Sequence, residues 1–254
     1  KRQIDIGVDS KKVFLTGNMK FDHKIPDVNP EKKERLLKDL NLYPEDQIFI
    51  AGSTHSGEEE VILDVFQQLI QEHPRLVLIL APRHPERFQE VEKLVKGKNF
   101  ISARRTQIGK NNPSFHPQVM LLDTIGELSQ LYGIGDIIFV GGSLVNIGGH
   151  NILEPLAYKK PVIFGPYMQN FSEIAQTLEK SGAGILAQTG ENLLIQAKKL
   201  LANKRYAQVL GKKGFQVIQK HQGATDRNME MIKQFIQVRE QKKRWQAKGV
   251  RNHQ

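Results

Sequence analysis

The residues with the clearest potential for chemistry follow the apolar segment Ile137–Val140. They combine glycines with polar side chains: Gly141, Gly142, Ser143, Gly149, His150, Asn151 and Glu154. A strand that ends in glycines and then opens a helix presents backbone N–H groups to a small anion. The polar side chains add hydrogen-bond donors, acceptors and charge. This arrangement suits a phosphate, a carboxylate and the hydroxyl groups of a sugar.

Polar loops also follow four other apolar segments of the chain. They are Gly52–Glu60, Pro82–Pro85, Asp123–Leu128 and Gly165–Phe171. Ligands of open parallel sheets bind beyond the carboxyl ends of the strands. We therefore expect these loops to converge with the glycine-rich loop on one site.

The elements that must position these loops alternate between short apolar runs and helical patterns. The predicted strands are Val13–Leu15, Ile48–Ala51, Leu76–Leu80, Phe100–Ser102, Val119–Leu122, Ile137–Val140, Pro161–Phe164 and Gly184–Ala187. The predicted helices are Glu31–Leu40, Glu58–Glu72, Pro85–Lys96, Ile125–Tyr132, Ile152–Ala157, Phe171–Lys180, Asn192–Ala202 and Arg205–His221. Continuous apolar runs indicate strands that are buried on both faces. The alternation predicts an α/β fold, with a Rossmann-like parallel sheet and helices on both faces.

Two of the loops allow a structural as well as a functional interpretation. Ser53 and Thr54 could cap the helix that follows them, or they could contact a phosphate. Arg83 could form a surface ion pair. An arginine fixed directly after a buried strand is better suited to hold a carboxylate or phosphate through two parallel hydrogen bonds. His84 could donate a hydrogen bond to the same anion.

The same choice arises at the next two sites. Asp123 or Thr124 could cap a helix whose first turn contains Glu127. Gly126 would weaken that turn, which points to a close approach by a ligand or by neighbouring backbone. Glu154 suits the positive end of a helix, but a carboxylate there can also hold a ribose diol. We favour the second role for Glu154.

The composition and the missing motifs exclude several kinds of site and segment. The 254-residue chain contains no cysteine, which excludes disulfides and thiolate metal sites. It has no apolar run long enough to cross a bilayer and no secretory signal. The sequence patterns of dinucleotide, P-loop and HExxH zinc sites are absent, and we expect neither a metal nor a cofactor. Because the chain starts at Lys1, we expect it to be a piece of a longer protein.

The formal net charge of +10 is concentrated near the C-terminus. Residues 236–254 hold six basic residues and one acidic residue. A solvated helix face and a surface that rests on anionic lipid headgroups are both open interpretations. Trp245 lies among these charges and favours an interface. No RNA- or DNA-binding motif accompanies them, so we expect no nucleic-acid partner.

Six segments of the chain resemble, in order, the C-terminal half of bacterial Kdo transferases, where Kdo is 3-deoxy-D-manno-octulosonic acid. They are TGNMKFD (Thr16–Asp22), AGSTHSGEEE (Ala51–Glu60), APRHPERF (Ala81–Phe88), DTIGEL (Asp123–Leu128), VGGSLVNIGGHNILEP (Val140–Pro155) and GPYMQNF (Gly165–Phe171). Each segment alone is a weak signal. Six in register are specific.

The resemblance implies the C-terminal domain of a GT-B glycosyltransferase, in which two Rossmann-like domains face each other across a cleft. It implies transfer of Kdo from CMP-Kdo to the lipid A precursor (lipid IVA) in lipopolysaccharide biosynthesis, at the cytoplasmic face of the inner membrane of Gram-negative bacteria. The acceptor site and catalytic base then belong to an N-terminal domain absent from this chain. We therefore expect no catalytic residue here and no activity of the chain alone.

The resemblance also implies a donor site built from the polar loops. The amides of Gly141, Gly142, Ser143 and Gly149–Asn151 would hold the phosphate of CMP-Kdo. Ser53, Arg83 and His84 would bind that phosphate or the Kdo carboxylate, Asn151 and Glu154 the ribose, and backbone around Ile125 and Gly126 the cytosine. Thr54, Glu127 and His150 complete the predicted set. Lys20 would neutralise the leaving phosphate or the Kdo acid, with a solvated lysine as the alternative.

The expected division of the chain has three parts. Residues 1–24 form a linker and the start of the domain, residues 25–235 the nucleotide-sugar-binding domain, and residues 236–254 a basic helix or tail. The expected partners are CMP-Kdo, the lipid A precursor, the N-terminal acceptor domain and an anionic membrane surface. Two other functions stay open: a sugar-nucleotide epimerase of GT-B architecture, and a noncatalytic nucleotide-binding module.

Overall fold

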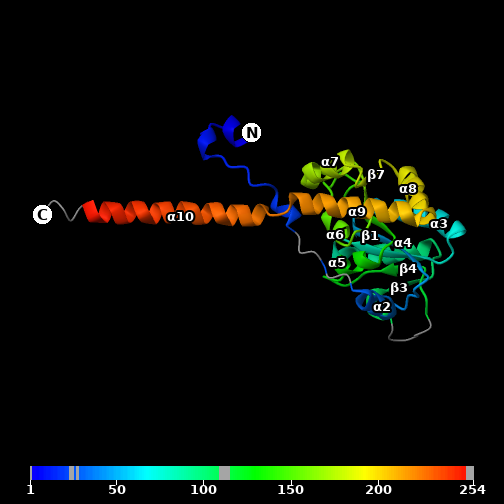
Figure 1. Cartoon of the computed structure of the whole chain (residues 1–254). Helices are drawn as coiled ribbons and strands as arrows, with labels where there is room; N and C mark the ends of the chain where they lie inside the picture. The colour runs from blue at the N-terminus through cyan, green and yellow to red at the C-terminus, as the bar shows by residue number, and fades with distance from the viewer. Residues whose placement is uncertain (1, 23–25, 27–28, 109–114, 250–254) are drawn as a thin grey trace. The chain divides into compact units, whose positions relative to one another are not determined.

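The computed structural model describes residues 2–22, 26, 29–108 and 115–249 (Figure 1). Its centre is a parallel sheet of seven strands in the order β3-β4-β2-β1-β5-β6-β7. The strands are β1 (Gln47–Thr54), β2 (Leu76–Pro82), β3 (Ser102–Arg104), β4 (Val119–Leu121), β5 (Ile137–Val140), β6 (Ile163–Phe164) and β7 (Ile185–Leu186). The predicted parallel sheet is confirmed.

The strand order reverses direction at β1. The chain adds β2, β4 and β3 on one side of β1 and then β5, β6 and β7 on the other. The registers Phe49 to Ile137 and Gln47 to Leu76 place β5 and β2 directly beside β1. A crevice opens at such a reversal, beyond the carboxyl ends of the strands, because the flanking connections leave in opposite directions. The fold therefore offers a binding site where β1, β2 and β5 end.

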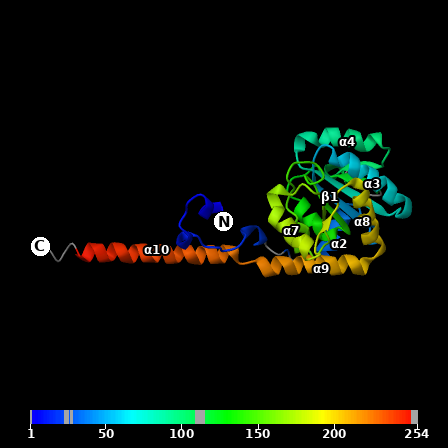
Figure 2. The ribbon, with the colours of Figure 1, turned by 90° about the horizontal axis from the view of Figure 1, so that it is seen from above.

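Helices surround this sheet (Figure 2). They are α2 (Pro30–Asp39), α3 (Glu58–Glu72), α4 (Phe88–Gly97), α5 (Leu128–Leu131), α6 (Leu153–Ala157), α7 (Ser172–Lys180), α8 (Gly190–Ala202) and α9 (Lys204–His221). On one face of the sheet, Phe49, Leu78 and Phe139 join the apolar faces of α3, α4 and α8 in one core. On the other face, Ile50 and Ile138 are also fully buried. The strands are apolar throughout because both of their faces are covered.

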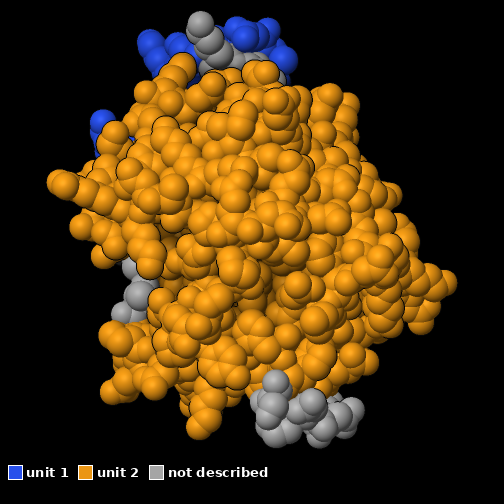
Figure 3. Space-filling view, turned by 90° about the vertical axis from the view of Figure 1, so that its right-hand side faces the viewer, with its two compact units in different colours: residues 1–23, 218–254 blue, residues 24–217 orange. Residues whose placement is uncertain are grey.

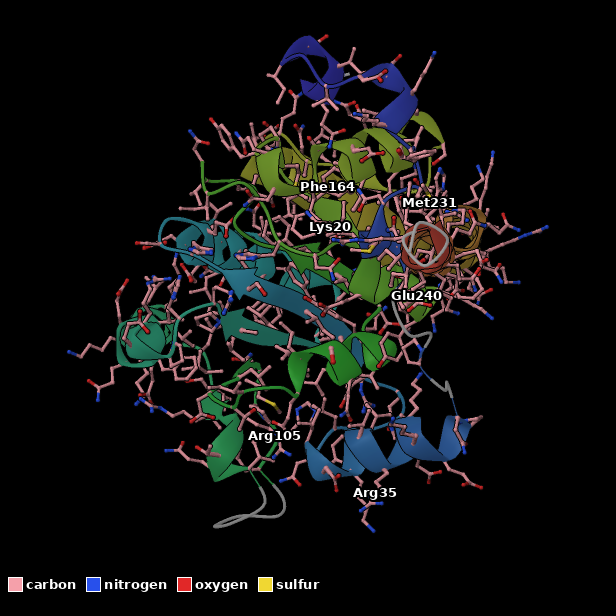
Figure 4. All side chains as sticks on the ribbon, turned by 90° about the vertical axis from the view of Figure 1, so that its left-hand side faces the viewer. Lys20, Arg35, Arg105, Phe164, Met231 and Glu240 are labelled. Carbon is pink, nitrogen blue, oxygen red and sulfur yellow. The ribbon has the colours of Figure 1, made fainter. Side chains whose placement is uncertain are left out.

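Several predicted elements differ at their boundaries, and two of these differences have a clear physical reason. The helix predicted from Ile125 begins at Leu128, because Gly126 has a φ of +89° and cannot belong to a right-handed helix. The third strand begins at Ser102, where its pairing with β4 begins, rather than at Phe100. Phe164 of strand β6 lies in the buried core. Arg35 is exposed on helix α2 and projects away from the strands (Figure 4).

The chain divides into two compact units (Figure 3). Unit 2 comprises residues 24–217 and contains the whole sheet; unit 1 comprises residues 1–23 and 218–254. The three-part division of the chain expected above stays a prediction. No described helix is both long enough and apolar enough to cross a membrane.

Unit 1 joins the start of the chain to its last helix. Its elements are α1 (Arg2–Asp5), the short 3-10 helices η1 (Ser10–Lys12) and η2 (Met19–Phe21), and α10 (Ala224–Gly249), which carries Met231 and Glu240 in Figure 4. The strand predicted at Val13–Leu15 is wrong. Phe14 packs edge-on against Phe235 at 5.8 Å between ring centres, and Leu15 is 100% exposed. Among the described residues this segment has no strand to pair with.

Candidate functional site

A cavity of about 290 Å³ lies at the carboxyl end of the sheet in unit 2. Its walls are formed by Ser53, Arg83, Tyr132, Val140, His150, Asn151, Glu154 and Phe171. Ser53 comes from the end of β1, Arg83 directly follows β2, and the residues from Val140 to Glu154 follow β5. The structure thus brings together five of the residues predicted from sequence for the donor site. We call this the polar cavity.

Ser53 lines the polar cavity through an unusual backbone conformation. Its φ is +56°, and the register of β1 against β2 shifts between Gly52 and Thr54. Such a bulge turns a side chain away from the regular alternation of the strand. The capping interpretation of Ser53 and Thr54 is wrong, because α3 is preceded by Gly57 at φ +88° and has no side-chain cap. Thr54 is buried and instead donates to Glu59 Oε1 at 2.9 Å.

The glycine-rich loop does not offer its first amides to a ligand. The N–H groups of Gly142, Ser143 and Leu144 donate to the buried carboxylate of Glu58 at 2.7–2.9 Å. The carboxylate also accepts from the N–H of His55 at 3.0 Å. The predicted anion cradle therefore exists, but its anion is a side chain of the protein. The predicted amide contacts of Gly142 and Ser143 with phosphate are corrected accordingly.

The other predicted amides in this loop are also used internally. Gly141 N–H donates to Gly52 O at 2.8 Å, and Gly149 N–H donates to Gly142 O at 2.7 Å. Ser143 is fully buried; its hydroxyl donates to Val140 O and accepts from Gly165 N–H. These residues shape the loop, so the glycine-rich loop positions the site rather than lining it with free N–H groups.

Three imidazoles gather beside the polar cavity. The Nε2 atoms of His55 and His150 are 2.7 Å apart, with their rings within 6° of parallel. His84 meets His55 edge-on at 5.2 Å between ring centres. Burial lowers the pKa of His150 to about 4, and His55, Arg83 and His84 add to this effect. Burial also lowers the pKa of His55, although Glu58 opposes the shift.

His55 was missed by the sequence reasoning. It lies in the loop between Ser53 and Gly57, and its position in that polar loop was the signal that could have found it. Tyr132 and Phe171 were also missed as wall residues. Nothing in their sequence context separates them from core aromatics. Tyr132 is buried, and a Cβ on Gly52 would lie 2.2 Å from its hydroxyl, so the two residues fit only as a pair.

Two arginines follow β2 in different roles. Arg87 binds the buried carboxylate of Glu59 at 2.7 Å and Glu90 at 2.8 Å. Burial opposes the charged form of Arg87, but these hydrogen bonds outweigh it and raise its pKa. Arg83 is exposed and takes no part in an ion pair within the described part of the chain, where Arg75, Arg87, Arg104 and Arg105 do. The ion-pair interpretation of Arg83 is therefore wrong, and Arg83 lines the polar cavity.

Asn151 and Glu154 form the opposite wall. Asn151 Nδ2 donates to Glu154 Oε1 at 3.1 Å, while Asn151 Oδ1 accepts from Leu153 N–H at 3.1 Å. The second contact is a local side-chain to backbone hydrogen bond of Asn151 with the residue two positions further along the chain. The first holds the Glu154 carboxylate in place at the edge of the cavity. A carboxylate can accept hydrogen bonds from two neighbouring hydroxyl groups.

The loop after β4 does not line the polar cavity. Asp123 accepts from the N–H and the hydroxyl of Thr106, and Thr124 donates to Glu127, which also binds Arg105 (labelled in Figure 4). No side chain caps α5, so the capping interpretation of Asp123 and Thr124 is wrong. Ile125 is 86% exposed, and nothing lies within 4 Å of a Cβ placed on Gly126, whose φ alone requires glycine. The predicted contacts of this loop with cytosine stay predictions.

Two further predictions concern the limits of the site. Lys20 lies in η2 of unit 1, and its role stays a prediction. Across the described ranges, no three histidine, aspartate or glutamate side chains are grouped in a way that could hold a metal ion. The polar cavity is lined by the guanidinium-bearing Arg83, the imidazole-bearing His150 and the carboxylate-bearing Glu154, with hydroxyl and amide groups from Ser53, Tyr132 and Asn151.

Comparisons with known proteins identify relatives of this chain. The 3-deoxy-D-manno-octulosonic acid transferase of Haemophilus influenzae is 40% identical over 239 residues, which are 93% of this chain and 55% of that protein. The enzyme of Aquifex aeolicus is 36% identical over 200 residues, 79% of this chain and 51% of that protein. The chain spans about half the length of these curated relatives. No protein-family model matches it.

A solved structure decides the family. The C-terminal CMP-Kdo binding domain of WaaA from Acinetobacter baumannii matches with a TM-score of 0.68 at 33% identity, covering 74% of this chain and 97% of that domain. This chain belongs to the Kdo transferase family. A glycosyltransferase from Rickettsia africae, with a TM-score of 0.60 at 16% identity over 90% of this chain and 59% of that one, shares the fold alone. The Kdo transferase domain described here thus resembles the C-terminal domains of GT-B glycosyltransferases.

Proposed function

We propose that this chain is the donor-binding part of an enzyme that transfers Kdo from CMP-Kdo to the lipid A precursor. The observation that carries the proposal is the polar cavity, which is lined by Arg83 and by Glu154, whose carboxylate accepts from Asn151. CMP-Kdo has one phosphate, one sugar carboxylate and one ribose. The cavity offers a cation for the anions and an acceptor for the ribose hydroxyls. The solved relative that binds CMP-Kdo supports this assignment.

Arg83 and the histidines take over the role expected of backbone amides. Because Glu58 occupies the N–H groups of Gly142 and Ser143, positive charge for the phosphate has to come from side chains. Arg83 can bind a phosphate or carboxylate through two parallel hydrogen bonds. His84 and His150 can donate one each. Donors that bind the departing phosphate more strongly as its charge grows lower the barrier to transfer.

The remaining parts of the reaction belong to the portion of the protein outside this chain. The curated relatives are about twice as long, and we assign the acceptor site and the catalytic base to a part of the enzyme that this chain does not include. On this proposal, the chain alone binds the donor but transfers no Kdo. The lipid substrate would place the full-length enzyme at the cytoplasmic face of the inner membrane.

Two substitutions test the roles of opposite walls of the polar cavity. Glu154→Gln removes the acceptor proposed for the ribose, and we expect it to weaken CMP and CMP-Kdo alike, by about tenfold or more. Arg83→Gln should weaken CMP-Kdo more than CMP, because CMP lacks the sugar carboxylate. Isothermal titration calorimetry measures both affinities.

Glu60→Gln is the matched control, because Glu60 is exposed on α3 and does not line the polar cavity. Its affinities should equal those of the unsubstituted chain. Unchanged CMP binding in Glu154→Gln would refute the ribose assignment. An equal loss of CMP and CMP-Kdo in Arg83→Gln would refute the carboxylate assignment.

A further inference from the structure

A second cavity lies at the opposite, amino-terminal edge of the sheet in unit 2. Its volume is about 270 Å³, and it is bordered by Gln47 at the start of β1, Asp136 before β5 and Pro161 before β6. Four lysines also line it: Lys33, Lys159, Lys160 and Lys204. We call it the lysine cavity. None of its wall residues belongs to the polar cavity.

The charges around the lysine cavity are unbalanced. Four ammonium groups face one carboxylate, and Asp136 already accepts from Ile48 N–H at 2.9 Å. The lysine ion pairs in the described part of the chain use Lys96, Lys98 and Lys198 instead. Lys159 does lie 4.9 Å from the centre of the Phe215 ring, a cation–π contact that leaves its charge in place. The cavity therefore carries an excess of positive charge that the described residues do not neutralise.

Lys160 is the most deeply placed of the four ammonium groups. Burial lowers its pKa, and Lys33 adds to that effect while Asp136 opposes it. A half-buried cation without an ion-pair partner costs free energy, and a bound anion would offset that cost. The position of Lys160 therefore favours the binding of an anion beside it.

The backbone around Lys160 is rigidly held. Lys160 N–H donates to Pro155 O at 3.2 Å, and Lys159 has a φ of +58°, a conformation that non-glycine residues adopt only when their surroundings impose it. Helix α9 packs so closely on this turn that a Cβ on Gly211 would lie 1.9 Å from Lys159 O. The lysines are thus presented from a fixed turn, which lowers the ordering cost of binding an anion.

The first turn of α9 adds to the positive character of the cavity. It begins at Lys204 and contains no acidic residue. The amino end of a helix carries a partial positive charge, so acidic side chains are favoured there and cations are not. Here a cation stands at that end and lines the cavity. Asn203 Oδ1 accepts from Tyr206 N–H at this helix end at 2.8 Å, but it is uncharged, so a bound anion would still be favoured by the helix end and the lysines together.

We propose that the lysine cavity is a second anion site of this protein and binds a compact phosphate group. One water takes about 30 Å³ of liquid volume, so the cavity has room for a phosphate with part of its hydration shell. The site is independent of the donor-binding function proposed above. The phosphate group could belong to a free ion or to a lipid headgroup, and the experiment separates these two sources.

The test titrates the 254-residue chain with inorganic phosphate at constant ionic strength. In the unsubstituted chain, phosphate should raise the pKa of Lys160, followed through its side-chain NMR signal, because a nearby anion favours the charged ammonium. Lys160→Gln should weaken phosphate binding by about tenfold or more in calorimetry. Lys180→Gln removes the same charge from the exposed end of α7, away from the cavity, and should leave the affinity unchanged.

A second arm uses phosphatidylcholine vesicles with and without phosphatidic acid. If Lys160→Gln weakens binding to the phosphatidic acid vesicles more than binding to inorganic phosphate, the ligand is a lipid headgroup. If it weakens binding to inorganic phosphate more, the ligand is a free phosphate. Either result supports the site. Saturating CMP should leave phosphate binding intact. Displacement of phosphate by CMP, or equal binding by Lys160→Gln and Lys180→Gln, would overturn the proposal. The proposal would also be overturned if phosphate left the pKa of Lys160 in the unsubstituted chain unchanged. This measurement does not depend on the folding of a variant.

Discussion

At the scale of single residues, the hydrogen bond between His55 and His150 governs how the polar cavity responds to pH. The two Nε2 atoms are 2.7 Å apart, so one ring donates and the other accepts through a neutral nitrogen. A proton on the accepting nitrogen would break this contact, because two N–H groups would then face each other and one of the two rings would carry a positive charge. The other charged or titratable groups that act on the pair are Glu58, His84, Arg87 and Arg83.

This pair predicts a loss of stability in mild acid. The pKa of His150 is about 4 in the folded chain, below its ordinary value of 6.5. Between these values the unfolded chain binds more protons than the folded chain, so the free energy of unfolding falls as the pH drops from about 6.5 to about 4. His150→Gln lacks this titration. Urea unfolding at several pH values should show the unsubstituted chain losing stability relative to the variant over that range; a constant difference would contradict the prediction.

Side chains of the polar cavity were predictable where they lie at or beyond the carboxyl ends of the strands. Ser53, Arg83 and Glu154 were placed by the rule that parallel strands end at one edge of the sheet. The hydrogen-bond partner of the backbone N–H groups in the glycine-rich loop was not predictable. Gly142 and Glu58 are 84 residues apart. In the sequence, Glu58 has the context of an ordinary acidic residue at the start of a helix. Pairing between residues so distant in sequence depends on the completed sheet.

At the scale of elements, Glu58 connects the start of α3 to the loop after β5. Glu58→Gln would leave an amide –NH₂ facing the backbone N–H groups of Gly142, Ser143 and Leu144. We expect the free energy of unfolding to fall by roughly 3 kcal/mol, because charged hydrogen bonds to buried groups are lost. Chemical denaturation measures the change.

Glu60→Gln is the matched control for this substitution. Glu60 lies in the same first turn of α3 but is exposed, so its variant should unfold within about 0.5 kcal/mol of the unsubstituted chain. Equal stability of the two variants would show that Glu58 does not hold the loop.

Elements with long apolar or strongly periodic sequences were predicted well. The bounds of α3 agree with the predicted Glu58–Glu72, and β5 agrees with Ile137–Val140. Val13–Leu15 is as apolar as a strand but has no strand beside it. An apolar tripeptide is compatible with several structures, and its neighbours in space decide which one forms.

At the scale of the whole molecule, α10 combines exposed apolar side chains with basic ones. Met229, Ile232, Phe235, Ile236 and Val238 are all about half exposed. Residues 236–254 carry six basic residues and one acidic residue. Apolar and cationic groups on one helix suit the surface of an anionic membrane, where each Lys or Arg contributes about 1 kcal/mol.

Removal of residues 236–254 should therefore lower the affinity for vesicles that contain anionic lipid. Sedimentation with vesicles at low and high salt measures this, and binding of the intact chain should weaken with salt. A chain with the six basic residues replaced by glutamine is the control for helix length. If the shortened chain binds anionic vesicles as well as the intact chain does at low salt, α10 is a solvated or interdomain helix instead.

The measurement that tests the central claim most directly is the nucleotide selectivity of the intact 254-residue chain. NMR titrations with CMP-Kdo, CMP, UDP and UDP-glucose compare the donor of a Kdo transferase with those of other GT-B proteins. The account predicts saturable binding of CMP-Kdo and CMP, with shifts of Ser53, Arg83, His150 and Glu154, and no saturable response to UDP. Saturable binding of UDP without a response to CMP would contradict it.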